Sequence, residues 1–179
     1  MSYKPPFLSI PGFLKIGESE RANIIDLILE NRKKYYPTYK YSFPLFDDPE
    51  GCFRSLYYKH LDAVINLLGG FHLRFDNAPL CWCYYGSQDN SPLFFHDHLL
   101  TSTISSVYYL QVNPGDNIIF RSPEGEEFTH YPEEGDLICF PNYLTHSPGL
   151  PVNYKRPRCS INMEIMAHES AHSIFPVPG

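Results

Sequence analysis

Two histidines separated by a single residue, His96 and His98, are the first feature of this sequence that suggests chemistry. They follow the apolar residues 92–95, so we expect them on an extended strand. Residues two apart in a strand project to the same face about 7 Å apart, so both imidazoles could bind one ion. Asp97 could replace either ligand if the strand bulges, and otherwise it faces away and hydrogen-bonds behind the ligands. The H-x-H pattern alone is weak evidence, because paired histidines are also common as ordinary surface or core residues.

A third candidate ligand, His146, ends the segment 135–146, whose pattern is typical of a turn, a buried strand and a loop. Functional residues are often found at such strand ends. Three neutral imidazoles on one face suit iron, nickel, copper or zinc and leave coordination positions open for a substrate. The sequence therefore predicts a metal site formed by His96, His98 and His146. The other five histidines have no partner in strand register and are expected to be structural or exposed; they are His60, His72, His130, His168 and His172.

The secondary structure expected around these histidines is helical in the first part of the chain and mainly β from residue 71 onward. Helical spacing of apolar residues predicts helices over 18–34 and 53–68, the second ended by Gly69 and Gly70. From residue 71 onward, short runs of β-branched and aromatic residues alternate with turn clusters. We expect strands near 71–76, 80–86, 94–98, 103–112, 117–120, 137–140 and 158–166. Their number and spacing suit a sandwich or barrel with the helices on one face.

The composition limits the class of protein. A length of 179 residues, with 43% hydrophobic and 19% charged residues, indicates one globular domain. Within it we expect helical support over 1–70, a β core over 71–166 and a loosely packed tail over 167–179. The formal charge of −6 argues against nucleic acid as a partner, and no apolar stretch is long enough to cross a membrane, so we expect a cytoplasmic protein. The five cysteines are expected to be buried, reduced thiols.

From His96 through Asn162 the chain resembles the non-haem Fe(II)- and 2-oxoglutarate-dependent dioxygenases. Four segments carry the resemblance: H-D-H at 96–98, S-S-V-Y-Y-L-Q-V at 105–112, G-D-L-I-C-F-P at 135–141 with the following His146, and R-C-S-I-N at 158–162. Their order along the chain is more specific than any one of them. The resemblance implies a double-stranded β-helix (a jelly roll, as in the cupins) and an Fe(II)-dependent hydroxylase that uses 2-oxoglutarate and O2. Such an enzyme would hydroxylate a small molecule, an amino acid or a peptide and release succinate and CO2.

The resemblance also assigns roles to individual residues. His96, His98 and His146 would hold the iron, and Arg158 would bind the distal carboxylate of 2-oxoglutarate. A period of two places Arg158, Ser160 and Asn162 on one strand face. A guanidinium is a good carboxylate anchor because its planar fork donates two parallel hydrogen bonds, which Ser160 and Tyr109 could supplement. Arg156 is a competing choice one strand period earlier, but Pro157 breaks the ladder between them.

We expect Tyr84 and Asn142 to line the substrate pocket, whereas Trp82 is expected in ordinary core packing.

One departure from the family pattern leaves alternatives open. His98 stands where these enzymes usually carry a carboxylate, which changes the charge of the ligand set. A cupin-type dioxygenase with three histidines and no need for 2-oxoglutarate is the competing enzyme class, although the glutamate of the first cupin motif is missing. A non-catalytic barrel that binds a metal or a metabolite is the third possibility. Arg158 and the strand over 105–112 favour the 2-oxoglutarate enzyme, and formation of succinate would distinguish it from a cupin.

Overall fold

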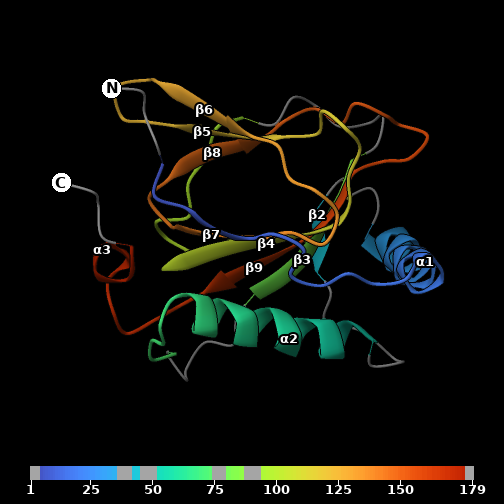
Figure 1. Cartoon of the computed structure of the whole chain (residues 1–179), viewed down its shortest axis with the longest axis horizontal. Helices are drawn as coiled ribbons and strands as arrows, with labels where there is room; N and C mark the ends of the chain where they lie inside the picture. Colours follow the sequence, from blue (N-terminus) through green and yellow to red (C-terminus); the bar gives the residue numbers. More distant parts are fainter. Residues whose placement is uncertain (1–4, 36–41, 45–51, 74–79, 87–93, 176–179) are drawn as a thin grey trace.

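The computed structural model describes residues 5–35, 42–44, 52–73, 80–86 and 94–175 (Figure 1). Helices and strands follow one another in the order β1 (Leu8–Ile10), α1 (Glu18–Tyr35), β2 (Ser42–Pro44), α2 (Cys52–Leu67), β3 (Leu80–Tyr85), β4 (Ile104–Gln111), β5 (Ile118–Arg121), β6 (Glu127–His130), β7 (Leu137–Pro141), β8 (Thr145–Pro148), β9 (Cys159–Ile165) and α3 (Ala171–Ile174). The two long helices therefore precede most of the strands.

The strands form two antiparallel sheets that face one another (Figure 1). The major sheet has the order β1-β7-β4-β9-β3-β2, and the minor sheet has the order β6-β5-β8. Neighbours in these sheets are far apart in sequence, as where β4 pairs with both β7 and β9. Two facing sheets with such crossing connections form a double-stranded β-helix, and the expectation of this fold is confirmed.

Successive side chains along a strand point to opposite faces of the major sheet, so each strand contributes to two different cores. On β4, Ile104, Tyr108 and Leu110 belong to the core on the helical side, whereas Val107 and Tyr109 belong to the core between the sheets. The helix α2 runs along the outer face of the major sheet (Figure 1), and its fully buried Val64 packs into the outer core together with Ile28 of α1. Burial of these apolar side chains holds the helices on the sheet, and the inner face remains available for a site.

Most of the elements expected from the sequence are present, with differences at short strands. Both helices and the strands near 80–86, 103–112, 117–120, 137–140 and 158–166 agree to within about two residues. The expected strand at 94–98 is reduced to a single bridge at His96, and that at 71–76 to a bridge at Leu73, with 74–76 outside the described residues. The loop expected before His146 instead leads into a strand, β8, and β1, β2, β6 and α3 were not anticipated. These elements have three or four residues each, too few to show a period.

The C-terminal segment combines buried and exposed residues. Ala167 and Phe175 are buried in the outer core, while His168, Ser170, His172 and Ser173 between them are exposed. The backbone N–H of His168 donates to the carbonyl of His72 and anchors the segment. Residues 176–179 lie outside the described part.

Four cysteines are buried with free thiols, as expected, namely Cys81, Cys83, Cys139 and Cys159. The thiols of Cys83 and Cys159 are hydrogen-bonded to each other at 3.5 Å. The side chain of the fifth, Cys52, lies outside the described part of the chain. In the ranges that the structure covers, every helix is too short or too polar to cross a bilayer.

Candidate metal centre

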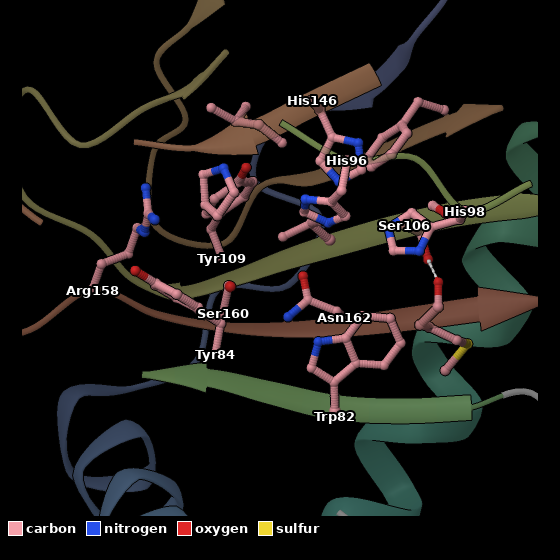
Figure 2. Close-up of a pocket in the computed structure, with 16 residues that line it drawn as sticks. Trp82, Tyr84, His96, His98, Ser106, Tyr109, His146, Arg158, Ser160 and Asn162 are labelled. Carbon is pink, nitrogen blue, oxygen red and sulfur yellow. Dashed lines mark hydrogen bonds between the residues drawn. The ribbon is translucent and has the colours of Figure 1, made fainter. Parts of the chain in front are cut away.

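The imidazoles of His96, His98 and His146 come together between the two sheets. One nitrogen of each ring lies within 4.8 Å of the corresponding nitrogen of the other two. The ring centroids are 4.4 Å apart for His96 and His146 and 5.1 Å apart for each pair that includes His98. Figure 2 shows the three rings turned toward one another at one side of the cavity. These three residues could hold a metal ion.

Backbone pairing explains how residues so distant in sequence meet. The N–H of His96 donates to the carbonyl of His146 at 3.0 Å, and the N–H of His146 donates back at 2.9 Å. This mutual pair is a one-residue antiparallel bridge that attaches the H-x-H segment to the edge of β8. The N–H of His98 donates to the carbonyl of Asn142 at 2.8 Å, just before β8. All three ligands are thus fixed relative to one strand.

Hydrogen bonds at the Nδ1 atoms orient each ring. Nδ1 of His96 bonds to the carbonyl of Phe94 at 3.1 Å, and Nδ1 of His146 bonds to the carbonyl of Leu144 at 3.0 Å. Nδ1 of His98 lies 2.5 Å from a carboxylate oxygen of Glu164. Because carbonyls and carboxylates accept, each ring must carry its proton on Nδ1, and Nε2 keeps the lone pair that a metal needs. The arrangement fits a divalent ion bound by three Nε2 atoms.

The protonation of the rings also fits metal binding. Burial, reinforced by the neighbouring His96, lowers the pKa of His146 to about 3. Partial burial lowers the pKa of His96 as well. A neutral imidazole is the form that binds a metal, so at neutral pH these two rings are ready for coordination. Asp97 is exposed, its carboxylate accepts from the backbone N–H of Leu99 at 3.2 Å, and it does not belong to the cluster of candidate ligands.

A cavity of about 260 Å³ opens beside the histidines, within the space between the sheets. Its wall includes all three of them, and also Trp82 and Tyr84 of β3, Tyr109 of β4, and Arg158, Ser160 and Asn162 on and next to β9. Figure 2 shows these side chains arranged around one space, with Arg158 at the end away from His98. Apolar residues such as Ile118 and Phe140 complete the wall. The size is near the lower end for ligand pockets and suits a small organic acid.

Arg158 is the cationic group of this cavity and is 1% exposed. Its guanidinium donates to the carbonyls of Asn117 at 2.6 Å and of Gly149 at 2.9 Å, and its Cζ lies 4.9 Å from the centre of the Tyr84 ring. The two carbonyls accept from two of the five N–H donors of an arginine, so further donors remain for an anion. The competing Arg156 instead pairs with Glu134 and does not line the cavity.

Most of the other expected pocket residues lie around the same cavity. Burial raises the pKa of Tyr109, so its hydroxyl stays protonated and can donate. The side-chain amide nitrogen of Asn162 is buried and has no hydrogen-bond partner among the residues that the structure describes. Trp82 lies on the cavity wall 6.1 Å from the ring of His98, so the expectation of ordinary core packing is wrong for this residue, because it shares its strand face with Tyr84. Asn142 does not line the cavity; its amide instead donates to the carbonyl of Ser102 at 2.6 Å.

Sequence reasoning missed Glu164, whose carboxylate contacts His98. A signal was present, since Glu164 follows Arg158, Ser160 and Asn162 at the same spacing of two and therefore lies on the same strand face. The structure places it opposite Leu80 of β3 and Ser105 of β4, in the middle of the major sheet. The sequence alone could not show that this carboxylate meets His98.

The similarity of this chain to known proteins lies in its fold. No protein-family model matches the chain, and no match was found among curated proteins. Among solved structures, the chain is similar to a prolyl hydroxylase from Trichoplax adhaerens in complex with a hypoxia inducible factor peptide fragment, with a TM-score of 0.61, 16% identity and coverage of 90% of this chain and 83% of that one. It is also similar to the non-heme alpha ketoglutarate dependent carbocyclase SnoK of nogalamycin biosynthesis, with a TM-score of 0.64, 11% identity and coverage of 93% and 83%. A third similar structure is HygX from Streptomyces hygroscopicus with nickel and 2-oxoglutarate bound, with a TM-score of 0.58, 11% identity and coverage of 89% and 82%.

Proposed function

We propose that this protein is an Fe(II)- and 2-oxoglutarate-dependent oxygenase that hydroxylates a small molecule, an amino acid or a peptide. The observation that carries the proposal is that three convergent imidazoles and the buried guanidinium of Arg158 face one cavity of about 260 Å³. A metal site beside a fixed cation is what a chelating dicarboxylic acid requires. The similar solved structures include enzymes described as alpha ketoglutarate dependent and one with 2-oxoglutarate bound, which supports the same ligand here.

The protein groups around the cavity have separate tasks in this proposal. His96, His98 and His146 hold Fe(II) through Nε2 and leave positions open for the co-substrates. The guanidinium of Arg158 binds the distal carboxylate of 2-oxoglutarate, with the hydroxyls of Ser160 and Tyr109 as further donors. The amide nitrogen of Asn162, which has no partner in the described part of the chain, offers a donor within the cavity. When bound, Fe(II) and 2-oxoglutarate together supply the activation of O2, with release of succinate and CO2 and transfer of oxygen to a C–H bond.

The apolar side chains of the cavity wall also have a role in the proposed reaction. Ile118 and Phe140 are buried side chains that exclude water from the space beside the histidines. Tyr84 packs its ring near the Arg158 guanidinium and limits the orientations of the cation. The prime substrate would approach from the side of His96, the most exposed of the three ligands. One similar enzyme was solved with a peptide fragment bound, and a peptide is therefore one of the substrate classes to test.

Anaerobic titration tests the proposal directly. Fe(II) and then 2-oxoglutarate are added to metal-free protein, and the weak visible charge-transfer band of the ternary complex is followed. We expect a saturable band with one equivalent of each, and formation of succinate once O2 is admitted. His146→Ala should abolish the band, whereas the control His168→Ala replaces an exposed histidine outside the cavity and should leave it unchanged. Absence of 2-oxoglutarate binding to the Fe(II)-loaded protein would refute the proposal.

The ligand set itself favours one alternative, a three-histidine metal oxygenase of the cupin type that does not use 2-oxoglutarate. Its specific support is that the three candidate ligands are all imidazoles, without a carboxylate among them. Such an enzyme would consume O2 with its own substrate in the absence of any oxo acid. Measurement of O2 uptake and of succinate in parallel, with and without 2-oxoglutarate, separates the two functions.

A further inference from the structure

Glu164 is a buried carboxylate in direct contact with one candidate ligand. Its side chain is 6% exposed, and its Oε1 lies 2.5 Å from Nδ1 of His98, whose side chain is 12% exposed. The other two rings, those of His96 and His146, bond through Nδ1 to neutral backbone carbonyls. His98 is therefore the ring among these three that carries a charged hydrogen-bond acceptor behind it.

The position of Glu164 in the sheet makes this contact rigid. Glu164 lies on β9, which pairs with β3 on one side and with β4 on the other, and its neighbours in register are Leu80 and Ser105. A strand paired on both sides has little freedom to shift. Burying a carboxylate costs free energy unless it is paired, and the N–H of His98 provides that pairing. The side chain is thus held against one imidazole rather than free to turn to solvent.

The contact between Glu164 and His98 also changes the net charge around the candidate metal site. Three neutral imidazoles bring no negative charge to a divalent ion. The Glu164 carboxylate, bonded to the far side of the His98 ring, brings one negative charge close to the ion without taking a coordination position. Carboxylates in this place fix the orientation of a ligating histidine and make its ring a stronger donor. Asp97 cannot take this part, because it is exposed and bonded to the backbone of Leu99.

We propose that Glu164 is a positioning residue of the metal centre, which orients His98 for coordination and supplies the negative charge that the three-histidine ligand set lacks. The inference rests on the proposed function insofar as a divalent metal must bind at the three histidines. It does not depend on the binding of 2-oxoglutarate. It adds a fourth residue to the centre, one that acts through His98 and does not itself bind the ion.

The test uses Co(II), a spectroscopically visible divalent ion, on the full chain. Glu164→Gln keeps the size of the side chain and an oxygen acceptor but removes the charge, and Glu164→Ala removes both. We expect the dissociation constant for Co(II), measured by competition with a chelator, to rise roughly 10- to 100-fold, and more for Glu164→Ala than for Glu164→Gln. The matched control is Glu127→Gln, which removes a carboxylate from an exposed ion pair with Arg121 on the minor sheet and should change the constant less than twofold.

A second readout separates positioning from a merely structural role. In the Co(II)-loaded protein, each of the three ligating rings should give one exchangeable Nδ1–H proton resonance shifted by the metal. Glu164→Ala should displace or broaden one of these, that of His98, and leave the other two in place. The melting temperature of the metal-free protein, taken for every variant, shows whether the variant is folded.

The outcomes are distinct. Unchanged Co(II) affinity in both Glu164 variants, together with three unchanged resonances, would overturn the inference, even if the melting temperature fell. Weakened Co(II) binding with loss of one resonance supports it. If the wild-type protein binds Co(II) but never 2-oxoglutarate, the proposed oxygenase function fails while the role of Glu164 still stands. If the wild-type protein binds 2-oxoglutarate and both Glu164 variants bind Co(II) as the wild type does, the proposed oxygenase function stands while the role of Glu164 fails.

Discussion

Replacing Arg158 by methionine should weaken the binding of 2-oxoglutarate much more than it weakens the metal site. Methionine fills most of the same length but has no N–H donor. Removing one partner of a buried, hydrogen-bonded charge pair costs about 2–5 kcal/mol. Arg158 is 1% exposed, so solvent cannot replace it, but Ser160 and Tyr109 remain as donors on the same wall. We therefore expect a loss of about 2–4 kcal/mol, which is roughly 30- to 700-fold in the dissociation constant.

The same substitution should also lower stability, and this effect must be measured separately. Arg158 donates to the carbonyls of Asn117 and Gly149. The Asn117 carbonyl keeps the backbone N–H of Gly149 as a donor, whereas the Gly149 carbonyl, left buried without its arginine donor, costs about 1–3 kcal/mol. Urea denaturation gives the loss of folding free energy, and far-UV circular dichroism shows whether the variant is folded under assay conditions. Arg158→Lys keeps the positive charge but loses the planar guanidinium with its paired N–H donors, so it should bind 2-oxoglutarate more tightly than Arg158→Met does.

The assay is anaerobic titration of the Fe(II)-loaded protein with 2-oxoglutarate, followed by the visible band or by calorimetry. Arg156→Met is the matched control, because Arg156 lies two residues away and pairs with Glu134 outside the cavity. It should change the dissociation constant less than twofold. A folded Arg158→Met variant that binds 2-oxoglutarate as tightly as the wild type would refute the assignment of the carboxylate anchor.

Three further predictions concern stability. Burial lowers the pKa of His60 to about 3, so as the pH falls the unfolded chain takes up a proton at this residue before the folded chain does. The free energy of unfolding should therefore fall as the pH drops from 6.5 toward 3, by at most about 1.4 kcal/mol per pH unit. His60→Gln should make the free energy of unfolding, measured with urea, depend less on pH, and an unchanged slope would contradict this. A Cβ at Gly149 would collide with the buried side-chain oxygen of Asn117, so Gly149→Ala should cost about 1–3 kcal/mol in thermal melts. Gly17→Ala, with open space around it, should be nearly neutral. Tyr108→Phe loses a 2.9 Å hydrogen bond to the carbonyl of Leu14 and should cost about 1 kcal/mol in urea denaturation; no change would mean that water replaces this bond.

The long elements were predictable because their patterns are local. Eighteen residues of α1 and sixteen of α2 carry several helical turns, and the strands β4 and β9 are long enough to show an alternating face. Three or four residues show little period, so β1, β2, β6 and β8 were not anticipated. β5, also four residues long, was anticipated from its apolar run over 118–120 after a turn cluster. The four residues of β8 include His146, and the strand is defined by pairing with β5 and by the bridge to His96.

The side of the strand on which a residue lies was predictable, but its partner across the cavity was not. The spacing of Arg158, Ser160 and Asn162 placed all three on one face, and all three line the cavity. Trp82 shares a face with Tyr84 for the same reason, and the expectation that it packs in the core was wrong because its aromatic character was given more weight than its register. Asn142 was expected in the pocket, whereas its amide donates to the carbonyl of Ser102.

The three histidines, the arginine and the order in which they occur were identified before the fold was known, because residue type and strand period are local properties of a chain. The buried carboxylate behind His98 became visible only in the three-dimensional arrangement. Glu164 lies 66 residues after His98 (164 − 98). The two side chains meet because β9 lies in the major sheet, whereas the H-x-H segment is bridged to the minor sheet that faces it. Long-range pairing of this kind depends on how the two sheets close on each other, which no local pattern encodes.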